Sequence, residues 1–320
     1  MDLTLDRAHH GRMDTLDRRG KVKAAAALSV AVVMWASAFV AIRAVVASGA
    51  YNPGQLSAGR LIVASTLLLL YGLARGRVHL PARRDRVRFL VLGATGQALY
   101  QLLLNTGERT VDAGTASLLV STAPIIASVL AVAFLGERMG LRAWLGTAVA
   151  FAGAAAIAAG AGGALRADAG AALVVVATCL WAVFLVVQKT LAARYDGFDL
   201  TAWPMWIGTL LLLPFAGGLP GAVAAAPSAA NAAVLWLGAF SSVVGFIAWA
   251  YAIKRLDVVV ATGALYCVPV AAFVIGLVFL GETPQVTALF GGVLVLAGVA
   301  LMRMKGPERF ARAEALEEAE

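Results

Sequence analysis

Long apolar runs alternate with short polar connections along most of the chain. A run of about twenty apolar residues is long enough for an α-helix to cross the hydrocarbon core of a bilayer. Ten runs of this kind occur, over residues 24–48, 53–74, 87–108, 113–136, 141–161, 170–192, 200–218, 231–253, 258–281 and 285–304. The pattern predicts an all-α polytopic membrane protein with ten transmembrane helices.

Polar segments flank these runs at both ends of the chain. Residues 1–22 mix basic and acidic side chains and lack the short apolar segment and small-residue cleavage site of a signal peptide. We expect a disordered cytosolic tail there, and a second, acidic cytosolic tail over residues 306–320.

Composition supports the membrane interpretation. Hydrophobic residues make up 61% of the 320 residues and charged residues only 14%, about half the share of a globular domain. A soluble fold could not bury that much apolar surface. This excludes a cytosolic enzyme, a secreted disulfide domain and a disordered chain. Cys179 and Cys267 both lie in apolar runs and are interpreted as packing residues, and we expect no metal site and no cofactor.

The positions of the basic residues set the predicted orientation. With the amino terminus in the cytosol, 22 of the 26 Lys and Arg residues lie in cytosolic segments, and only Arg109 and Arg166 lie in outer loops. Both termini are therefore expected on the cytosolic side of the cell inner membrane. Contact with the bilayer explains the net charge of +8, so no nucleic-acid partner is expected.

The chain resembles itself at a displacement of 145 residues, or 146 in its first span. The matched pairs include Pro124 with Pro269, the sequence Phe-Leu-Gly-Glu at 134–137 with the same sequence at 279–282, Trp35 with Trp181, and Arg43 with Lys189. A shared proline and a shared four-residue sequence at one displacement are stronger evidence for an internal repeat than matches of Ala and Gly, which are common in this composition.

Two repeats of five spans follow from this similarity, over residues 23–161 and 170–305, joined by a linker over 162–169. Because five is odd, the second repeat enters the membrane inverted relative to the first. Inverted repeats are typical of secondary transporters, whose substrate site lies near the midplane between the halves. The alternative is a duplication with no role in transport.

The two prolines indicate where a site could form. A proline within a helix frees the carbonyl four residues earlier, and in lipid that group needs a partner or a water-lined cavity. Ser121 precedes Pro124, and Tyr266 precedes Pro269. We expect Pro124 and Pro269 to be paired hinges; the alternative is that each only kinks its helix.

Polar and aromatic stripes supply further candidates. Gln97, Gln101 and Asn105 follow one another at i, i+4 and i+8, which predicts one helical face turned toward the bundle, and Arg60 lies about two turns inside its span. Helix–helix packing and hydrogen bonding are the alternatives for these stripes. Arg60 could offer its charge to a substrate carboxylate or tie helix ends together. Arg43, near a span end, could snorkel to the surface and is interpreted as a structural residue. The candidate substrate-binding residues are Trp35, Arg60, Gln97, Tyr100, Gln101, Asn105, Ser121, Trp181, Gln188, Trp249 and Tyr266.

Catalytic signatures are missing from the sequence. No zinc-protease, nucleophile-elbow or nucleotide-binding motif occurs, and no histidine or carboxylate lies in the middle of a span. No catalytic residue is therefore assigned. Glu108, Glu137 and Glu282 lie at span ends, so transport is expected to be facilitative or coupled through such a residue.

These residues together resemble the drug/metabolite transporter superfamily, in particular its ten-helix EamA-type branch. Residues 35–39, Trp-Ala-Ser-Ala-Phe, are similar to the family's first-helix Trp-Gly-Ser-Asn-Phe motif, and Arg60 to its second-helix arginine. The pattern of Pro followed by Leu-Gly-Glu, present in both repeats, is also typical of the family. Ala36 and Ala38 depart from the motif, so no substrate role is carried over to them.

The resemblance implies export of amino acids or other metabolites. We therefore interpret the chain as a secondary carrier of a small organic metabolite that works by alternating access, with amino-acid or related export favoured. A nucleotide-sugar-like or drug-like solute is the alternative within transport, and a membrane enzyme or scaffold is the alternative class. A homodimer is left open by the sequence.

Overall fold

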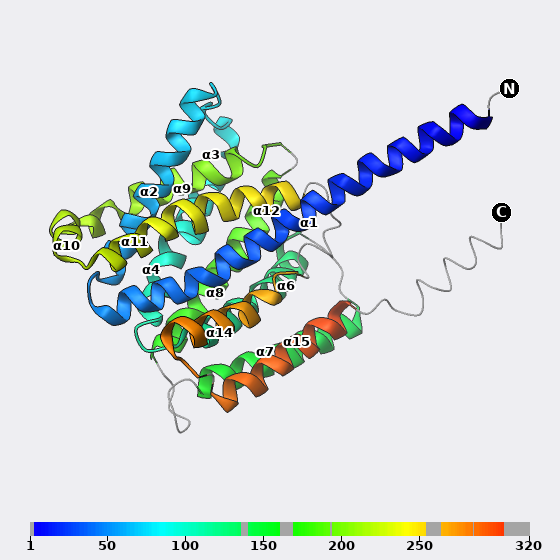
Figure 1. The fold of residues 1–320 in the computed structure, drawn as a ribbon. Coiled ribbons are helices and arrows are strands. Elements are labelled where there is room, and N and C mark those ends of the chain that lie inside the picture. Colours follow the sequence, from blue (N-terminus) through cyan, green and yellow to red (C-terminus); the bar gives the residue numbers. More distant parts are fainter. Residues whose placement is uncertain are drawn as a thin grey trace.

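The computed structural model describes residues 3–135, 140–160, 169–192, 194–253, 264–283 and 285–303. Within these ranges all regular secondary structure is helical (Figure 1). The first half contains α1 (Leu3–Ser48), α2 (Pro53–Ala74), η1 (Arg83–Asp85), α3 (Arg86–Leu92), η2 (Gly93–Leu99), α4 (Tyr100–Gly107), α5 (Ala113–Val120), α6 (Ala123–Leu135) and α7 (Leu141–Gly160). The second half contains α8 (Ala169–Leu191), α9 (Asp199–Leu212), η3 (Leu213–Ala216), α10 (Leu219–Ala225), α11 (Ser228–Trp236), η4 (Leu237–Val244), α12 (Gly245–Ile253), α14 (Cys267–Leu280) and α15 (Val286–Arg303).

The helices confirm a multi-pass membrane protein. In the described part of the chain, six helical segments are long and apolar enough to cross a membrane, and the bent pair Asp199–Ala216 and Leu219–Ala225 would make a seventh. Three shorter apolar helices, Leu141–Ile157, Cys267–Leu280 and Val286–Leu301, occupy the remaining predicted runs. Each of the ten predicted runs thus contains a helix, while the number of crossings and the sidedness of the termini stay predictions.

The amino-terminal segment differs from the expectation. It was expected to be disordered, but α1 extends without a break from Leu3 into the first apolar run, and Figure 1 shows this part projecting from the bundle. The segment contains no proline, so no residue in it is incompatible with the helix, although Gly11, Gly20 and four aspartates are weak helix formers. The predicted acidic tail and residues 162–168 of the predicted linker lie outside the described residues.

Helix packing is reciprocal between the two halves. In the first half α1 packs on α14 and α12, and in the second half the equivalent α8 packs on α6 and α4. Likewise α2 packs on η4, and its equivalent α9 packs on η2. Because each contact occurs twice with the halves exchanged, a two-fold relation connects the repeats.

The last helices of the two halves, α7 and α15, lie side by side at one edge of the bundle (Figure 1). A Cβ added at Gly153 would lie 2.6 Å from the carbonyl oxygen of Gly291, and one added at Gly298 would lie 2.5 Å from that of Gly146. Because rising residue numbers in α7 meet falling numbers in α15, the two equivalent helices are antiparallel. This is the arrangement that inverted repeats require.

Two kinds of irregularity interrupt the long helices at equivalent places. The chain leaves helical geometry at Ser121 and Thr122, just before Pro124, and α14 begins at Cys267, just before Pro269. In addition η2 and η4 are π-helical, with the residue range of η2 displaced by about 145 in η4. The prolines predicted the first pair of interruptions, whereas the π-helical pair was not predicted.

We expect Gly153→Ala to lower the apparent melting temperature of the detergent-solubilised protein. The added methyl group meets backbone atoms of α15 that cannot rotate away, and overpacking of this kind costs about 1–3 kcal/mol. Gly221→Ala is the matched control, because α10 leaves open space around Gly221 and alanine favours a helix by about 1 kcal/mol over glycine. Equal melting temperatures for the two variants would contradict the close contact of α7 with α15.

Candidate functional site

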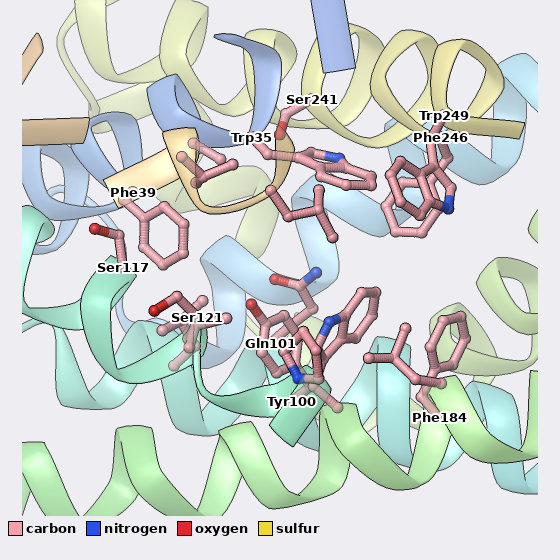
Figure 2. A pocket seen from close by; sticks show the side chains of 18 of the residues that line it. Trp35, Phe39, Tyr100, Gln101, Ser117, Ser121, Phe184, Ser241, Phe246 and Trp249 are labelled. Carbon is pink, nitrogen blue, oxygen red and sulfur yellow. The ribbon is translucent and has the colours of Figure 1, made fainter. Parts of the chain in front are cut away.

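A cavity of about 120 Å³, measured as the space open to the centres of water molecules, lies between the two halves. Helices of both repeats line it (Figure 2). The lining residues are Trp35, Ala38, Phe39, Ile42, Arg60, Tyr100, Gln101, Leu104, Ser117, Val120, Ser121, Pro124, Trp181, Phe184, Leu185, Gln188, Ser241, Phe246, Trp249, Leu265, Tyr266 and Val268.

Aromatic rings from both halves form much of the wall. The Trp35 ring contacts Phe246 with centroids 5.3 Å apart, and the equivalent Trp181 contacts Tyr100 at 5.0 Å. Trp35 and Trp181 are 146 positions apart, and so are Tyr100 and Phe246. The two contacts therefore join equivalent positions of the two repeats. Figure 2 shows Trp35 and Phe246 facing Tyr100 across the cavity.

Two further rings extend this wall at its ends. Phe184 stacks on Trp181 at 4.6 Å with an interplanar angle of 11°, and Trp249 lies 5.6 Å from Trp35. Rings held by such contacts have fixed orientations, so the wall offers a preformed apolar surface to a solute.

Arg60 supplies the positive charge of the cavity. Its side chain is 4% exposed, and its guanidinium donates from Nη1 to Oε1 of Gln101 at 2.7 Å and from Nε to Oγ of Ser242 at 3.1 Å. Among the described residues no carboxylate lies within ion-pair distance of it. A buried guanidinium held by neutral acceptors keeps its charge available to an anionic group.

The two π-helical segments place the partners of Arg60. Gln101 lies just after η2, and Ser242 lies within η4, where its hydroxyl donates to the carbonyl of Leu237, five residues earlier, at 2.9 Å. Close contact between α2 and η4 depends on Gly238, because a Cβ there would lie 2.8 Å from the Arg60 carbonyl oxygen. Arg60 is thus held between the halves rather than within one of them.

The interrupted helices form another part of the lining. The hydroxyls of Ser117 and Ser121 donate to the carbonyls of Gly114 and Leu118, each at 2.6 Å, and so leave their oxygen lone pairs as acceptors. The carbonyl end of α5 at Val120 reaches the cavity beside Pro124. Figure 2 shows Ser117 and Ser121 on the same side of the cavity as Phe39.

The structure brings most candidate residues to this one cavity. Nine line it: Trp35, Arg60, Tyr100, Gln101, Ser121, Trp181, Gln188, Trp249 and Tyr266. Their role in binding stays a prediction. Pro124 lines the cavity as well, whereas Pro269 is buried outside its lining.

Gln97 and Asn105 do not line the cavity, contrary to the expectation for the amide stripe. Both are buried, but Gln97 packs on Gly208 of α9, and Nδ2 of Asn105 donates to Oγ of Ser57 at 2.8 Å. The wide turns of η2 contain Gln97, so its spacing from Gln101 does not keep the two side chains on one face. Asn105 keeps regular spacing from Gln101 within α4, but its side chain is bonded to Ser57 of α2. Only Gln101 of the stripe therefore faces the cavity.

Several lining residues were missed by sequence analysis. Phe39 and Ile42 follow Trp35 at i+4 and i+7, so helical periodicity could have identified them. Ser241 lies within η4, where regular α-helical spacing does not hold, and no sequence signal marks it.

At one end of the bundle, Arg43 is partly exposed and makes polar contacts that fit its interpretation as a structural residue. Its Nε donates to Oε1 of Glu282 at 2.8 Å, and its Nη1 donates to the carbonyls of Glu108 and Arg109 at 2.7 and 2.8 Å. Oε2 of Glu282 also accepts from the backbone N–H of Ala113 at 3.3 Å. The span-end glutamate of the second repeat thus ties α1 to the loop before α5; Glu137, its equivalent, lies outside the described residues.

Comparison with known proteins gives concordant results. Residues 22–159 and 168–304 each match the EamA-like transporter family. A protein of Streptantibioticus cattleyicolor, named a probable terminal-alkyne amino-acid exporter, is 44% identical over 283 residues, which cover 88% of this chain and 94% of that protein.

More distant relatives are similar over almost the same length. The uncharacterized transporter YdfC of Bacillus subtilis is 34% identical over 277 residues, covering 87% of this chain and 90% of that protein. The uncharacterized inner membrane transporter YedA of Escherichia coli is 28% identical over 278 residues, covering 85% and 88%. A solved crystal structure that is 20% identical shares the fold, with a TM-score of 0.59 over 88% of this chain and 98% of that one.

We expect Gln101→Leu to destabilise the protein and Gln101→Glu to preserve its stability. The leucine leaves a guanidinium N–H of Arg60 buried without its acceptor, which costs about 1–3 kcal/mol, whereas the glutamate keeps an acceptor oxygen at the same reach. The fraction of each variant that stays monodisperse in detergent after heating measures the difference. Equal losses for both variants would show that Gln101 does not hold Arg60.

Proposed function

The chain belongs to the EamA-like transporter family, and on that basis we propose that it is a secondary carrier that exports an amino acid or a related small metabolite by alternating access. The named activity of the Streptantibioticus relative supports the solute class. The relatives' transporter names also favour a carrier over a membrane enzyme.

Arg60 is the observation that carries this proposal. It lies in a cavity between the two halves, its partners Gln101 and Ser242 are uncharged, and they come from different repeats. Burying a cation at membrane depth costs free energy of desolvation, so a buried arginine usually marks a functional site. Here that function would be to bind an anionic group. The carboxylate of an amino acid supplies that group, and a bidentate contact with guanidinium would orient it.

The ammonium group of the solute needs acceptors, and the interrupted fourth span offers them. The carbonyl end of α5 carries the negative end of the helix dipole, and Ser121 adds hydroxyl lone pairs. The carbonyl of Val120 has no N–H to pair with at Pro124. Carboxylate and ammonium would thus be bound by different parts of the lining.

The aromatic wall would then receive the solute's side chain. Its rings are fixed by the reciprocal contacts of Trp35 with Phe246 and of Trp181 with Tyr100. Stacked and edge-on rings accept flat, rod-shaped or apolar groups, so a short unsaturated side chain suits this wall better than a charged one.

Arg60 is also the single cation among the described lining residues. A nucleotide sugar carries a diphosphate, which calls for several cations at close quarters. This disfavours a nucleotide-sugar-like solute relative to an amino acid.

The two-fold relation of the halves supports alternating access. The main contacts of α1 and α2 with the other repeat have equivalents made by α8 and α9, so opening one side can be matched by closing the other. Pro124 and Pro269 lie at equivalent breaks, where a missing hydrogen bond leaves one softer joint per repeat. We assign these two joints as the hinges.

Counterflow in proteoliposomes tests the proposed solute class. Vesicles loaded with one unlabelled compound should take up its labelled form, and we expect exchange of L-propargylglycine and of its saturated counterpart norvaline, but not of nucleosides or cationic drugs.

Arg60→Gln should raise the half-saturating concentration about 10–100-fold, because a hydrogen bond to a charged group contributes about 1.5–3 kcal/mol. Gln101→Glu should also weaken exchange, since its carboxylate competes with the solute for Arg60.

Arg75→Gln is the matched control for these variants, because Arg75 follows the carboxyl end of the same helix, outside the cavity. It should exchange solute as the parent protein does. Exchange of nucleosides instead of amino acids, or undiminished affinity in Arg60→Gln, would refute the proposed solute class and the role of Arg60.

Replacement of a hinge proline should slow exchange more than it weakens binding. Pro124→Ala and Pro269→Ala each restore a backbone N–H that can bond to the carbonyl four residues earlier, which stiffens the joint. The maximal exchange rate and the half-saturating concentration, measured separately, distinguish the two effects, with Pro204→Ala in α9 as a control proline that lies outside the cavity lining. Parent-like rates in both hinge variants would show that neither joint moves.

A further inference from the structure

Glu108 is a buried carboxyl group that the proposed solute site does not use. It lies at the carboxyl end of α4, one helical turn beyond Leu104, which lines the cavity. Its side chain is 0% exposed, and neither carboxyl oxygen has a hydrogen-bond partner among the described residues.

The charged neighbours of Glu108 are all engaged with other groups. Arg43 of α1 bonds to Glu282 and to the backbone carbonyl of Glu108, not to its carboxyl group. Arg60 of α2 bonds to Gln101 and Ser242. Two more carboxylates are near: Glu282 after α14, and Asp112, which caps α5 through the N–H and hydroxyl of Thr115.

The remaining neighbours are uncharged. Packed against α4 on the α8 side are Gly170 and Val174, which contact Gly107. An ionised carboxylate without hydrogen-bond donors in such a place is strongly disfavoured relative to the neutral acid. The surroundings that the structure shows therefore favour the neutral acid of Glu108.

The ion pair of Arg43 with Glu282 lies next to this buried carboxyl group. Their ion pair joins α1 to the end of α14, and the contacts of Arg43 with the carbonyls of Glu108 and Arg109 hold the intervening loop. If this end opened, these contacts would break, and water could reach Glu108. The O–H bond could then break, with the proton passing to water and the carboxylate pairing with the released Arg43.

We propose that Glu108 is a proton-binding site that is protonated when the Arg43–Glu282 end is closed and exchanges its proton when that end opens. The inference rests on the proposed carrier function and adds that one proton moves in each transport cycle. The position equivalent to Glu108 in the second repeat is Ile253 at a displacement of 145, or Lys254 at 146, so the proton site belongs to one half only.

Infrared spectroscopy tests for the bound proton without any solute. The purified parent protein in lipid at neutral pH should show a carboxylic-acid C=O stretching band that Glu108→Gln lacks and that Glu108→Asp moves in frequency. Asp199→Asn, which removes a partly buried carboxyl group at the start of α9, is the control and should leave the band in place. A parent spectrum that Glu108→Gln and Glu108→Asp both leave unchanged would overturn the proposal.

Proteoliposomes with an internal pH dye test the coupling. With the membrane potential clamped, a gradient of one pH unit should sustain about a tenfold accumulation of L-propargylglycine, because one proton per solute and a tenfold concentration ratio both correspond to about 1.4 kcal/mol. Addition of a solute gradient should in turn change the dye signal. In Glu108→Gln, accumulation should fall to the equilibrium ratio and the dye signal should vanish, while counterflow persists.

Different results would refute the carrier function and the proton site at Glu108. Counterflow without a dye signal in the parent protein, or pH-driven accumulation that survives Glu108→Gln, would overturn the proton site and leave the carrier function intact. Absence of counterflow for every compound tested, with the infrared band present, would refute the carrier function instead. If Glu108→Gln does not fold, Glu108→Asp decides, because an unmoved infrared band in that variant overturns the assignment.

Discussion

Burial of one guanidinium group is the constraint on which the arrangement around the cavity depends. An arginine at membrane depth is costly unless its N–H groups find acceptors, and Arg60 finds them on two helices from different repeats. The third span supplies Gln101 just after the π-helical segment η2, and the eighth supplies Ser242 within the π-helical segment η4. Glycine at 238 then lets α2 approach closely enough for the bonds to form.

Much of this organisation could be predicted from the sequence because it follows from hydrophobic length and from proline chemistry. Every predicted run contains a helix, the two prolines mark real interruptions, and the repeat displacement relates the helices that pack reciprocally. The positions of Gln97 and Asn105 could not be predicted in the same way. A π-helical turn needs no particular residue type, so the sequence does not show that Gln97 leaves the face of Gln101. Asn105 keeps regular spacing from Gln101, but its partner Ser57 lies 48 positions away in the chain.

Arg43 illustrates a different limit. Its partner Glu282 lies 239 positions away in the chain, so inspection of the first span alone suggests a structural residue but does not identify its partner. The recurrence of charged residues in the two repeats could have identified the pair of Arg43 and Glu282. A basic residue recurs at 43 and 189, and an acidic residue recurs at 137 and 282, which is what a contact made twice between the halves would leave in the sequence.

The glycine contacts between α7 and α15 have a consequence for a single half of the molecule. In repeat numbering, Gly146 and Gly291 occupy one position and Gly153 and Gly298 another, and each position contacts the other across the interface. That is an isologous interface, the kind that two identical subunits form about a two-fold axis. The fifth helix of either half is therefore complementary to itself, and five-helix subunits bearing it could have assembled as antiparallel pairs before their genes were joined.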